Sequence, residues 1–379
     1  MHVVSDGASS GDPVRAEPGA LLASYDGIVC DLDGVVYRGG SAVPHAVESL
    51  TAAAQAAVRV VYATNNASRT PASVAEQLRD LGLHVDATAV VTSSQAGAER
   101  ILAMAGVGAP VLAVGGPGVR AALEERGLNV LDPAGAALAD RPVRAVLQGY
   151  GADVGWRDLA EAAYAVQRGA AWVATNDDAT LPTERGVAPG NGTLVAAVRA
   201  AVQVEPVVVG KPHTPLYALS ASVLGTSPGR TLAVGDRIDT DIAGANAAGM
   251  DALLVLTGVS SVSDLAYAEP ARRPRYLGLD LRCLLLAYPE PGRRRHPGSR
   301  QATVWTCGDA RVELRADGEI TGLTTGSADN RLRAAMTAIW HAQDEQNRPG
   351  HRAPAPVPGA HGLAAAVVEV TAMVEAQTH

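Results

Sequence analysis

The chain contains very little lysine and few aromatic residues. Lys211 is the single lysine among 31 Lys and Arg residues, Phe is absent, and aromatic residues make up only 3% of the sequence. Because Arg serves wherever a general positive charge is needed, the one retained lysine indicates a role that requires a compact ammonium rather than a planar guanidinium. The alternative is the chance survival of a surface lysine. The scarcity of aromatic rings gives no sign of a stacking cage for a base or a pyridine ring, which favours an aliphatic ligand.

Cysteine clusters, long apolar runs and excess positive charge are also missing. Cys30, Cys283 and Cys307 are far apart in the sequence, which excludes a disulfide framework and a zinc cluster and is typical of a reducing cytoplasm. No uninterrupted apolar run reaches the ~20 residues that span a membrane, and residues 1–20 lack the features of a signal peptide. The formal charge of −8 disfavours nucleic acid as a partner. We therefore expect a cytoplasmic protein that binds neither nucleic acid nor membrane.

What the chain does contain is a repeated alternation of strand and helix patterns. Such alternation predicts an α/β fold with a doubly wound, parallel, Rossmann-like sheet. A length of 379 residues predicts two or three domains. We expect a disordered tail at residues 1–18 and a core in two segments, 19–86 and 184–288. An α/β domain is inserted between these segments at residues 87–183. A linker with three consecutive arginines at residues 289–300 leads to a small C-terminal α+β module at residues 301–379.

A short apolar run at residues 25–30 predicts a buried strand, and two carboxylates follow it directly. Asp31 and Asp33 would then lie at the carboxyl end of a strand, where open α/β sheets bind ligands. Two acids so close repel each other unless a cation or a shared proton relieves them, and a divalent metal ion is our first interpretation. Gly34 lets the backbone approach an anion closely. On this stretch alone, an ordinary Asp-rich turn or the metal-binding Asp pair of a sugar transferase fits about equally well.

Three further predicted strands end in polar residues, and in a parallel sheet such ends converge on one crevice. The strands at residues 59–63, 207–209 and 231–234 are followed, in turn, by Thr64 with Asn65, by Lys211, and by Asp236 with Asp241. Helix capping is the alternative explanation for the first of these groups. Together with the two acids of the first strand, these residues provide carboxylates, a hydroxyl group and one ammonium group. The combination predicts a site for a metal ion and a phosphoryl group.

Four motifs in this order resemble those of the haloacid dehalogenase superfamily of phosphatases. They are Asp31-Leu32-Asp33-Gly34-Val35-Val36-Tyr37-Arg38-Gly39, Thr64-Asn65-Asn66, Gly210-Lys211-Pro212 and Gly235-Asp236-Arg237-Ile238-Asp239-Thr240-Asp241-Ile242. The long insertion between the second and third motifs is similar to the α/β (C2, type IIA) cap of the subclass that includes 4-nitrophenyl-, phosphoglycolate- and glycerol phosphate phosphatases. The resemblance covers about residues 20–288 and implies a Mg²⁺-dependent phosphomonoesterase. The C-terminal module lies outside it.

The resemblance implies a role for each acidic residue of the motifs. Asp31 would attack phosphorus and form an aspartyl-phosphate. Asp33 would protonate the leaving alkoxide and then activate water, so its pKa should be raised. Mg²⁺ would be held by Asp31, Asp236 and the backbone carbonyl of Asp33. Asp241 would hold Lys211 or a metal-bound water.

The resemblance also implies a set of phosphate-binding groups. Thr64, Asn65 and Lys211, with backbone N–H groups near Gly34, would hold the oxygens of the transferring phosphoryl group. Cys30 is a rival nucleophile by position alone. Its side chain should instead point to the opposite side of the strand and into the core, because side chains alternate along a strand.

Substrate choice is expected from the inserted domain, which would close over the crevice. The candidate residues in its loops are Ser93, Asp153, Asn176, Asp178 and Arg185. We expect a small phosphorylated metabolite, with glycerol 3-phosphate or a phosphoglycolate-like aliphatic phosphate preferred over pyridoxal phosphate or a nucleotide. A non-catalytic phosphate sensor or assembly module is the competing hypothesis. For the C-terminal module we expect the covering of a core surface or self-association into a homo-oligomer, rather than the activity of an acyltransferase remnant.

Overall fold

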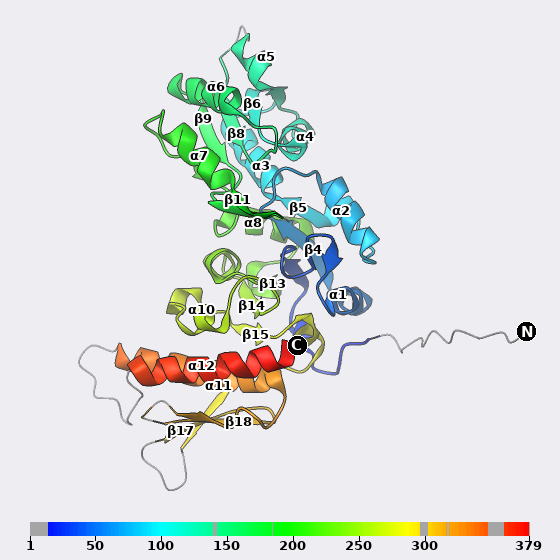
Figure 1. Cartoon of the computed structure of the whole chain (residues 1–379). Coiled ribbons are helices and arrows are strands. Elements are labelled where there is room, and N and C mark those ends of the chain that lie inside the picture. Colours follow the sequence, from blue (N-terminus) through cyan, green and yellow to red (C-terminus); the bar gives the residue numbers. More distant parts are fainter. Residues whose placement is uncertain are drawn as a thin grey trace, which may run out of the picture.

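The computed structural model shows three parts arranged one after another, with the core between a cap and a C-terminal module (Figure 1). We use "cap" for the part built on the sheet of residues 110–208 and "C-terminal module" for the part from residue 292 onward. The residues that the structure describes are 14–138, 142–183, 185–295, 302–315, 317, 319–347 and 360–378.

The core is a six-stranded parallel sheet in the order β15-β14-β13-β1-β4-β5. Its strands are β1 (Gly27–Cys30), β4 (Arg59–Thr64), β5 (Val90–Thr92), β13 (Thr231–Gly235), β14 (Asp251–Val255) and β15 (Tyr276–Gly278). The strands β1, β13 and β14 are almost continuously apolar, as expected when both faces of a sheet are covered. Because β4 and β13 flank β1, the residues that follow these three strands lie side by side at one edge. The predicted doubly wound α/β fold is confirmed.

Helices cover both faces of the core sheet. They are α1 (Ala46–Gln55), α2 (Pro71–Asp80), α8 (Thr214–Leu224), α9 (Ala243–Ala247) and α10 (Val262–Ala266), and a small hairpin of β2 (Tyr37–Arg38) and β3 (Ser41–Ala42) follows the first motif. Ile28 and Cys30 cluster with apolar residues of α1 and α2, whereas Val29 clusters with residues of α8. Cys30 is fully buried, so its side chain lies in the core, as the alternation along the strand predicted.

The cap is a second parallel sheet, in the order β12-β9-β8-β6-β7. Its elements are β6 (Pro110–Val114), β7 (Asn129–Leu131), β8 (Ala145–Gln148), β9 (Ala171–Ala174), β12 (Val207–Val208), the hairpin β10 (Thr180–Thr183) and β11 (Gly186–Pro189), and the helices α4 (Pro117–Glu125), α5 (Pro133–Ala137), α6 (Trp156–Gln167) and α7 (Asn191–Arg199). The helix α3 (Ser93–Ala105) packs against β8 and β9 of the cap and against α8 of the core, so it joins the two parts.

The sheet membership differs from the predicted borders of the inserted domain at residues 87 and 183. The strand β5 pairs with β4 in the core sheet, and β12 pairs with β9 in the cap sheet. The alternation of strand and helix continues through both borders without a break in composition. The local pattern therefore gives no indication of which of two sheets each strand joins.

The C-terminal module is an antiparallel sheet in the order β16-β17-β18-β19, with one long helix, α11, packed on β17 and β18 and a second, α12, packed on α11 and on α10 of the core. Its elements are β16 (Gly292–Arg295), β17 (Ala302–Cys307), β18 (Ala310–Arg315), β19 (Ile320–Thr321), α11 (Ala328–Gln346) and α12 (Ala360–Thr378). The predicted linker at residues 289–300 is wrong over β16, because the three arginines pair with β17. Pairing with a neighbouring strand here overrides the polar composition. Residues 296–300 of the predicted linker lie outside the described residues.

The chain enters the core through a segment that the sequence placed in a disordered tail. Residues 1–13 of that tail lie outside the described residues. Over residues 14–18 the prediction is wrong, because the N–H of Glu17 donates to the carbonyl of Leu285 at 2.8 Å. The next residues are buried, including Leu21 and Leu22. In the described parts of the chain, no helix has both the length and the apolar content needed to cross a membrane.

Candidate active site

Four charged side chains meet at the carboxyl edge of the core sheet. Asp31 follows β1, Asp236 follows β13, and Asp241 lies in a π-helical turn that leads into α9. One carboxylate oxygen from each of these three acids lies within 4.8 Å of the others. Lys211 reaches the same point from the loop after β12. The four groups therefore meet as the sequence predicted, but they do not come from one sheet, because Lys211 follows β12 of the cap sheet.

The ammonium group of Lys211 is shared between two carboxylates. The residue is only 4% exposed, so it is not the surface lysine of the alternative interpretation. Its Nζ contacts Oδ1 of Asp31 and lies 2.7 Å from Oδ1 of Asp241. Burial alone would lower the pKa of Lys211, but the carboxylates of Asp241 and Asp31 raise it well above its ordinary value. Lys211 is therefore a fixed positive charge directed at Asp31.

The site carries more negative than positive charge. Three carboxylates face one ammonium group, an excess of two negative charges when all are ionised. Burial raises the pKa of Asp31 well above its ordinary value, although Lys211 opposes this shift. Burial, together with the neighbouring Asp241 carboxylate, raises the pKa of Asp236 to about 6. A hard divalent cation with oxygen ligands, such as Mg²⁺, relieves an excess of this kind.

The surroundings of Asp236 fit such a cation. The residue is fully buried, and its Oδ2 accepts a hydrogen bond from the N–H of Val259 at 2.6 Å. Its Oδ1 has no hydrogen-bond partner within the described part of the chain. A Cβ atom at Gly34 or at Gly258 would come within 2.4 or 1.7 Å of Oδ2. The two glycines let the backbone approach Oδ2 closely, and the unpaired, buried Oδ1 is an oxygen that can serve as a Mg²⁺ ligand.

Asp33 and Thr64 lie beside this cluster. Asp33 is exposed, yet the protein desolvates its carboxyl group enough to raise its pKa, against the opposing effects of Lys211 and Arg69. A raised pKa is the direction that a proton donor needs. Thr64 is buried, and its Oγ1 accepts a hydrogen bond from the N–H of Asn66 at 3.0 Å. Its own hydroxyl hydrogen is left to donate to a ligand.

The side chain of Asn65 is already occupied by protein groups. Its Oδ1 accepts from the N–H of Lys211 at 2.7 Å, and its Nδ2 donates to the carbonyl of Lys211 at 3.0 Å. The second hydrogen of Nδ2 goes to Oδ2 of Asp178, at 3.1 Å. Because an amide nitrogen carries only two hydrogens, none is left for a phosphate oxygen. This arrangement differs from the prediction that the Asn65 side chain binds phosphate.

Three of the five predicted substrate-choosing residues converge on Asn65. The carbonyl of Asn65 accepts from Oγ of Ser93 at 2.8 Å and from Nδ2 of Asn176 at 2.7 Å, and Asp178 is the carboxylate just described. Ser93 and Asn176 are buried, so they hold the backbone of the site. The remaining two predicted residues, Asp153 and Arg185, are exposed. In the described ranges, neither makes a side-chain hydrogen bond to these site residues.

Sequence reasoning missed two contributors to the site. In the loop after β14, the hydroxyl of Thr257 donates to the carbonyl of Gly34 at 2.7 Å, next to the N–H of Val259 that holds Asp236. This loop follows the apolar strand β14, so the rule used for the other strand ends applies to it as well. The hydroxyl of Tyr217, on α8, donates to the carbonyl of Asp241 at 2.8 Å. The helical pattern around Tyr217 carries no signal of this contact.

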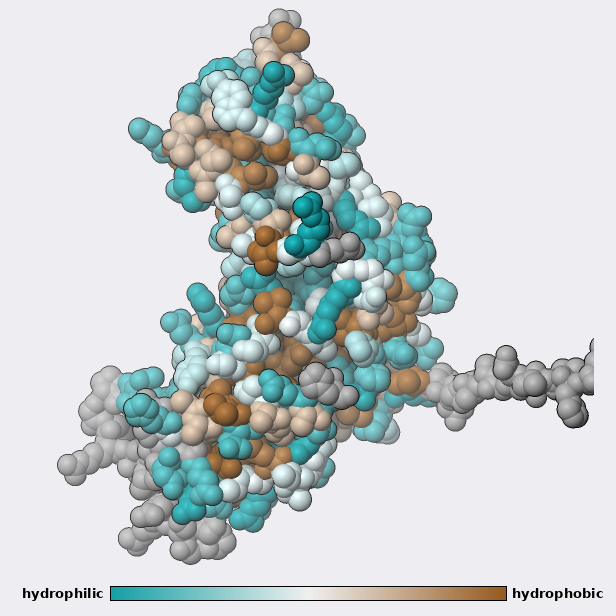
Figure 2. Space-filling model, in the orientation of Figure 1, coloured by the Kyte–Doolittle hydropathy of each residue, from teal (hydrophilic) through white to brown (hydrophobic). Residues whose placement is uncertain are grey.

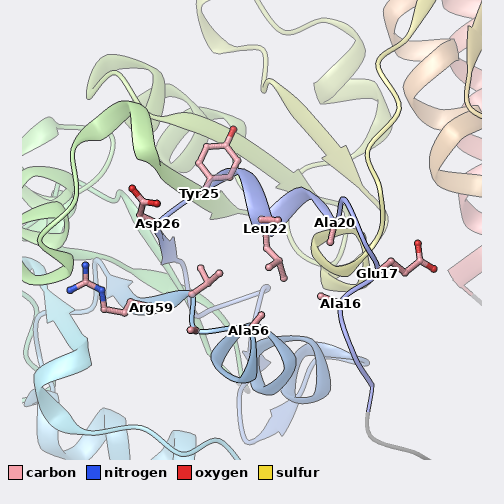
Figure 3. Close-up of a pocket in the computed structure, with 11 residues that line it drawn as sticks. Ala16, Glu17, Ala20, Leu22, Tyr25, Asp26, Ala56 and Arg59 are labelled. Carbon is pink, nitrogen blue, oxygen red and sulfur yellow. The ribbon is translucent and has the colours of Figure 1, made fainter.

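A cavity of about 540 Å³ lies at the opposite edge of the core sheet (Figure 3). Its lining includes Tyr25 and Asp26, directly before β1, and Arg59 at the start of β4. These residues are at the amino ends of the strands, about 13 Å from the carboxyl edge at roughly 3.3 Å per residue. The cavity is therefore separate from the carboxylate cluster. Figure 2 shows the surface hollowed between the cap and the core instead.

Comparisons with known proteins agree with this geometry. A family model described as haloacid dehalogenase-like hydrolase matches residues 28–129, and a second model of HAD hydrolase-like proteins matches residues 208–284. The chain is 41% identical to a D-glycerol 3-phosphate phosphatase of Mycobacterium tuberculosis over 339 residues, which cover 87% of this chain and 90% of the relative. A glycerol-3-phosphate phosphatase of Gallus gallus is 39% identical, over 69% of this chain and 88% of the relative.

A solved structure extends the likeness beyond the core and the cap. The crystal structure of a glycerol phosphate phosphatase from Mycobacterium tuberculosis in complex with magnesium matches with a TM-score of 0.73 and 37% identity. The match covers 93% of this chain and 99% of that chain. Coverage this complete has to include most of the C-terminal module, which lay outside the resemblance expected from the motifs.

The chain belongs to the haloacid dehalogenase-like hydrolases. It is a phosphatase, a phosphoric monoester hydrolase that uses Mg²⁺. The enzyme class, the metal and the capped α/β architecture predicted from the four motifs are thereby confirmed.

Proposed function

We propose that this phosphatase hydrolyses glycerol 3-phosphate, with Asp31 as the nucleophile and Asp33 as the proton carrier. The contact of the buried Lys211 ammonium with Asp31, beside the unpaired oxygen of Asp236, is the observation that carries the proposal. The choice of substrate is supported by two relatives, each named as a phosphatase of this compound. The low aromatic content also favours an aliphatic leaving group.

In the first step, a carboxylate oxygen of Asp31 attacks phosphorus while the bond from phosphorus to the glycerol oxygen breaks. Asp33 gives its proton to that oxygen, and glycerol leaves as an alcohol. In the second step, Asp33 takes a proton from water as the water oxygen attacks phosphorus. The bond to Asp31 then breaks and releases inorganic phosphate. The raised pKa of Asp33 suits it to start the cycle protonated.

Lys211 and the hydroxyl of Thr64 would hold the phosphoryl oxygens, with backbone N–H groups near Gly34, and Asp241 would keep Lys211 in place. Mg²⁺ would be held by Asp31, Asp236 and the carbonyl oxygen of Asp33, and when bound it supplies the positive charge that this acidic site lacks. Three unpaired, buried cysteines fit a reducing compartment, so we place the reaction in the cytoplasm.

Turnover of a panel of phosphorylated metabolites at fixed Mg²⁺ tests the proposal. The panel contains glycerol 3-phosphate, phosphoglycolate, pyridoxal phosphate, nucleoside monophosphates and 4-nitrophenyl phosphate. We expect glycerol 3-phosphate to give the highest kcat/KM. A higher value for pyridoxal phosphate or for a nucleotide would overturn the substrate. Complete absence of phosphate release in the presence of Mg²⁺ would instead favour the phosphate sensor.

A further inference from the structure

Asn65 lies where the cap meets the core, and its hydrogen bonds run in both directions. Toward the core, its side-chain amide holds both the N–H and the carbonyl of Lys211, at 2.7 and 3.0 Å. Toward the cap, the same amide donates to Asp178 at 3.1 Å. Its carbonyl accepts from Ser93 and Asn176 at 2.8 and 2.7 Å. The catalytic lysine and the cap therefore contact the same residue.

The cap residues that reach Asn65 sit on a tightly packed loop, residues 175–178, which we call the cap loop. Asn191 donates to the carbonyl of Asn176 at 2.6 Å, and the N–H of Gly192 donates to the carbonyl of Asp178 at 2.9 Å. A Cβ atom at Gly190 would come within 2.3 Å of the same Asp178 carbonyl. The turn that opens α7 thus fixes the cap loop, and with it the position of the Asp178 carboxylate.

The segment of Lys211 is packed equally closely against this junction. A Cβ atom at Gly210 would come within 2.4 Å of the carbonyl of Thr175 and within 2.6 Å of Oδ1 of Asn65. Glycine is therefore needed for the backbone before Lys211 to approach both. From this backbone position the side chain of Lys211 reaches Asp31 and Asp241.

We propose that Asn65 is a positioning residue through which the cap loop fixes the backbone of Lys211, and so places its ammonium on Asp31. The hydrogen bond from Asn65 to Asp178 links the cap to the backbone of the catalytic lysine, in addition to the pairing of β12 with β9 just before it. The inference rests on the phosphatase activity, and it does not depend on which phosphomonoester is the natural substrate. The competing roles are Asn65 as a ligand of phosphate and Asp178 as a charge that acts on the substrate.

Two substitutions of Asp178 separate these roles, with Asp177→Ala as the matched control. Asp178→Ala removes the hydrogen bond, whereas Asp178→Asn removes the charge but keeps an oxygen that can accept from Asn65. Asp177 is the exposed neighbouring acid, whose carboxylate lies 3.9 Å from His213. For each variant and for Asn65→Ala, kcat and KM for 4-nitrophenyl phosphate are measured at saturating Mg²⁺. Inhibition by inorganic phosphate and amide hydrogen exchange of residues 207–213 are measured alongside.

We expect Asp178→Ala, which loses one hydrogen bond, to lower kcat by about tenfold, and Asn65→Ala, which loses all three of its side-chain hydrogen bonds, to lower kcat further, each with a smaller change in KM. Asp178→Asn should lose less than Asp178→Ala. Within this segment, amide exchange in residues 207–211, which exclude His213, the contact of Asp177, should become faster in both alanine variants and stay at the parent rate in Asp177→Ala. Equal losses in the two Asp178 variants would assign the effect to charge and overturn the proposal.

Tighter phosphate inhibition together with faster turnover in Asp178→Ala would also overturn it, because the freed amide would then be binding phosphate. If Asn65→Ala does not fold, the exchange rates of the Asp178 variants decide alone. A parent enzyme that hydrolyses 4-nitrophenyl phosphate but not glycerol 3-phosphate would remove the proposed substrate and leave this test intact.

Discussion

Two of the buried cations in the described part of the chain lie in opposite kinds of surroundings, one in the active site and one against the C-terminal module. In the active site, Lys211 meets two carboxylates, and a third lies close by with an unpaired oxygen. Lys211 alone leaves the charge unbalanced. A buried site of this kind is complete only when another cation binds.

The second cation, Arg333 on α11, is only 3% exposed. Its Nε donates to the carbonyl of Leu277 on β15 at 2.9 Å, and its Nη1 donates to Oδ1 of Asn330 at 3.0 Å. The guanidinium lies 3.9 Å from the centroid of the Tyr288 ring, and Oδ1 of Asp329 is 3.7 Å from Nη2. One carboxylate balances one charge, and Nε and Nη1 donate in different directions, although Nη2 has no hydrogen-bond partner in the described part of the chain.

The difference separates a charge that acts on a ligand from a charge that holds two parts of the protein together. Lys211 is a point charge among acids, so its replacement should change turnover. Arg333 connects α11 to the last strand of the core, so its replacement should change stability. Substitutions at the two positions, and at their partners, test this division.

The largest effect is expected for Asp31→Asn, which removes the nucleophile and one partner of Lys211. Turnover should fall on the order of 10³-fold or more, as losses of nucleophiles do in other enzymes. Phosphate release under saturating Mg²⁺ measures it, with thermal unfolding as the control for folding. Turnover within tenfold of the parent would mean that another group, and not this carboxylate, attacks phosphorus.

Lys211→Arg should cost roughly 10²- to 10³-fold in kcat, the usual loss for one donor to a developing charge. The positive charge is kept, but the planar fork cannot take the place of a compact ammonium between Asp31 and Asp241. The measurement is kcat for glycerol 3-phosphate and for 4-nitrophenyl phosphate. Near-normal turnover would show that the lone lysine of the sequence has no special role.

These active-site residues were visible in the sequence because each directly follows an apolar strand. Asp31, Thr64 and Asp236 lie at the ends of core strands, and the order of these strands in a doubly wound sheet brings them together, whereas Lys211 comes from the loop after β12 of the cap sheet. The roles of their neighbours were not visible. Asn65 also follows a strand, but its partners come from segments more than 100 residues away in the chain, and no local pattern encodes such contacts.

The structure of the C-terminal module was less predictable from the sequence. The arginines of β16 form a strand only because β17 lies beside them, so composition alone predicted a linker. Arg333 lies on α11, but nothing in the local sequence pattern shows that it is buried against Leu277 and Tyr288. In both cases, contacts between residues far apart in the sequence determine the structure, and these contacts override local propensity.

At a concentration 100 times its Kd at pH 7.5, Mg²⁺ should stabilise the protein by about 2.7 kcal/mol, and the same concentration should stabilise it by less at pH 5.5. Without metal, the pKa of Asp236 is raised to about 6 by burial and by Asp241. A raised carboxyl pKa stabilises the folded state at low pH, and this contribution is lost as the pH rises through about 6. Mg²⁺ binds the ionised form, so protons compete with it at pH 5.5.

Thermal unfolding with and without Mg²⁺ at the two pH values checks this prediction. The metal-dependent rise in Tm should be larger at pH 7.5, and Asp236→Asn should reduce it at both values. An equal rise in Tm at the two pH values would show that Asp236 does not hold the metal, and it would weaken the contrast between the two buried cations.

Arg333→Lys is the reverse exchange and should have the smallest effect, confined to stability. A lysine in this place keeps the charge but loses the fork that joins Leu277 to Asn330 and stacks on Tyr288. We expect a loss of about 1–3 kcal/mol in the free energy of unfolding, while the folded enzyme keeps its turnover within about threefold of the parent, a change of less than 1 kcal/mol. Arg311→Lys, at an exposed position of β18, is the matched control and should change neither. A collapse of turnover at unchanged Tm would mean that the C-terminal module affects the active site as well as stability. A shift of α11 would then displace β15 and, with it, the sheet that carries Asp31 and Asp236.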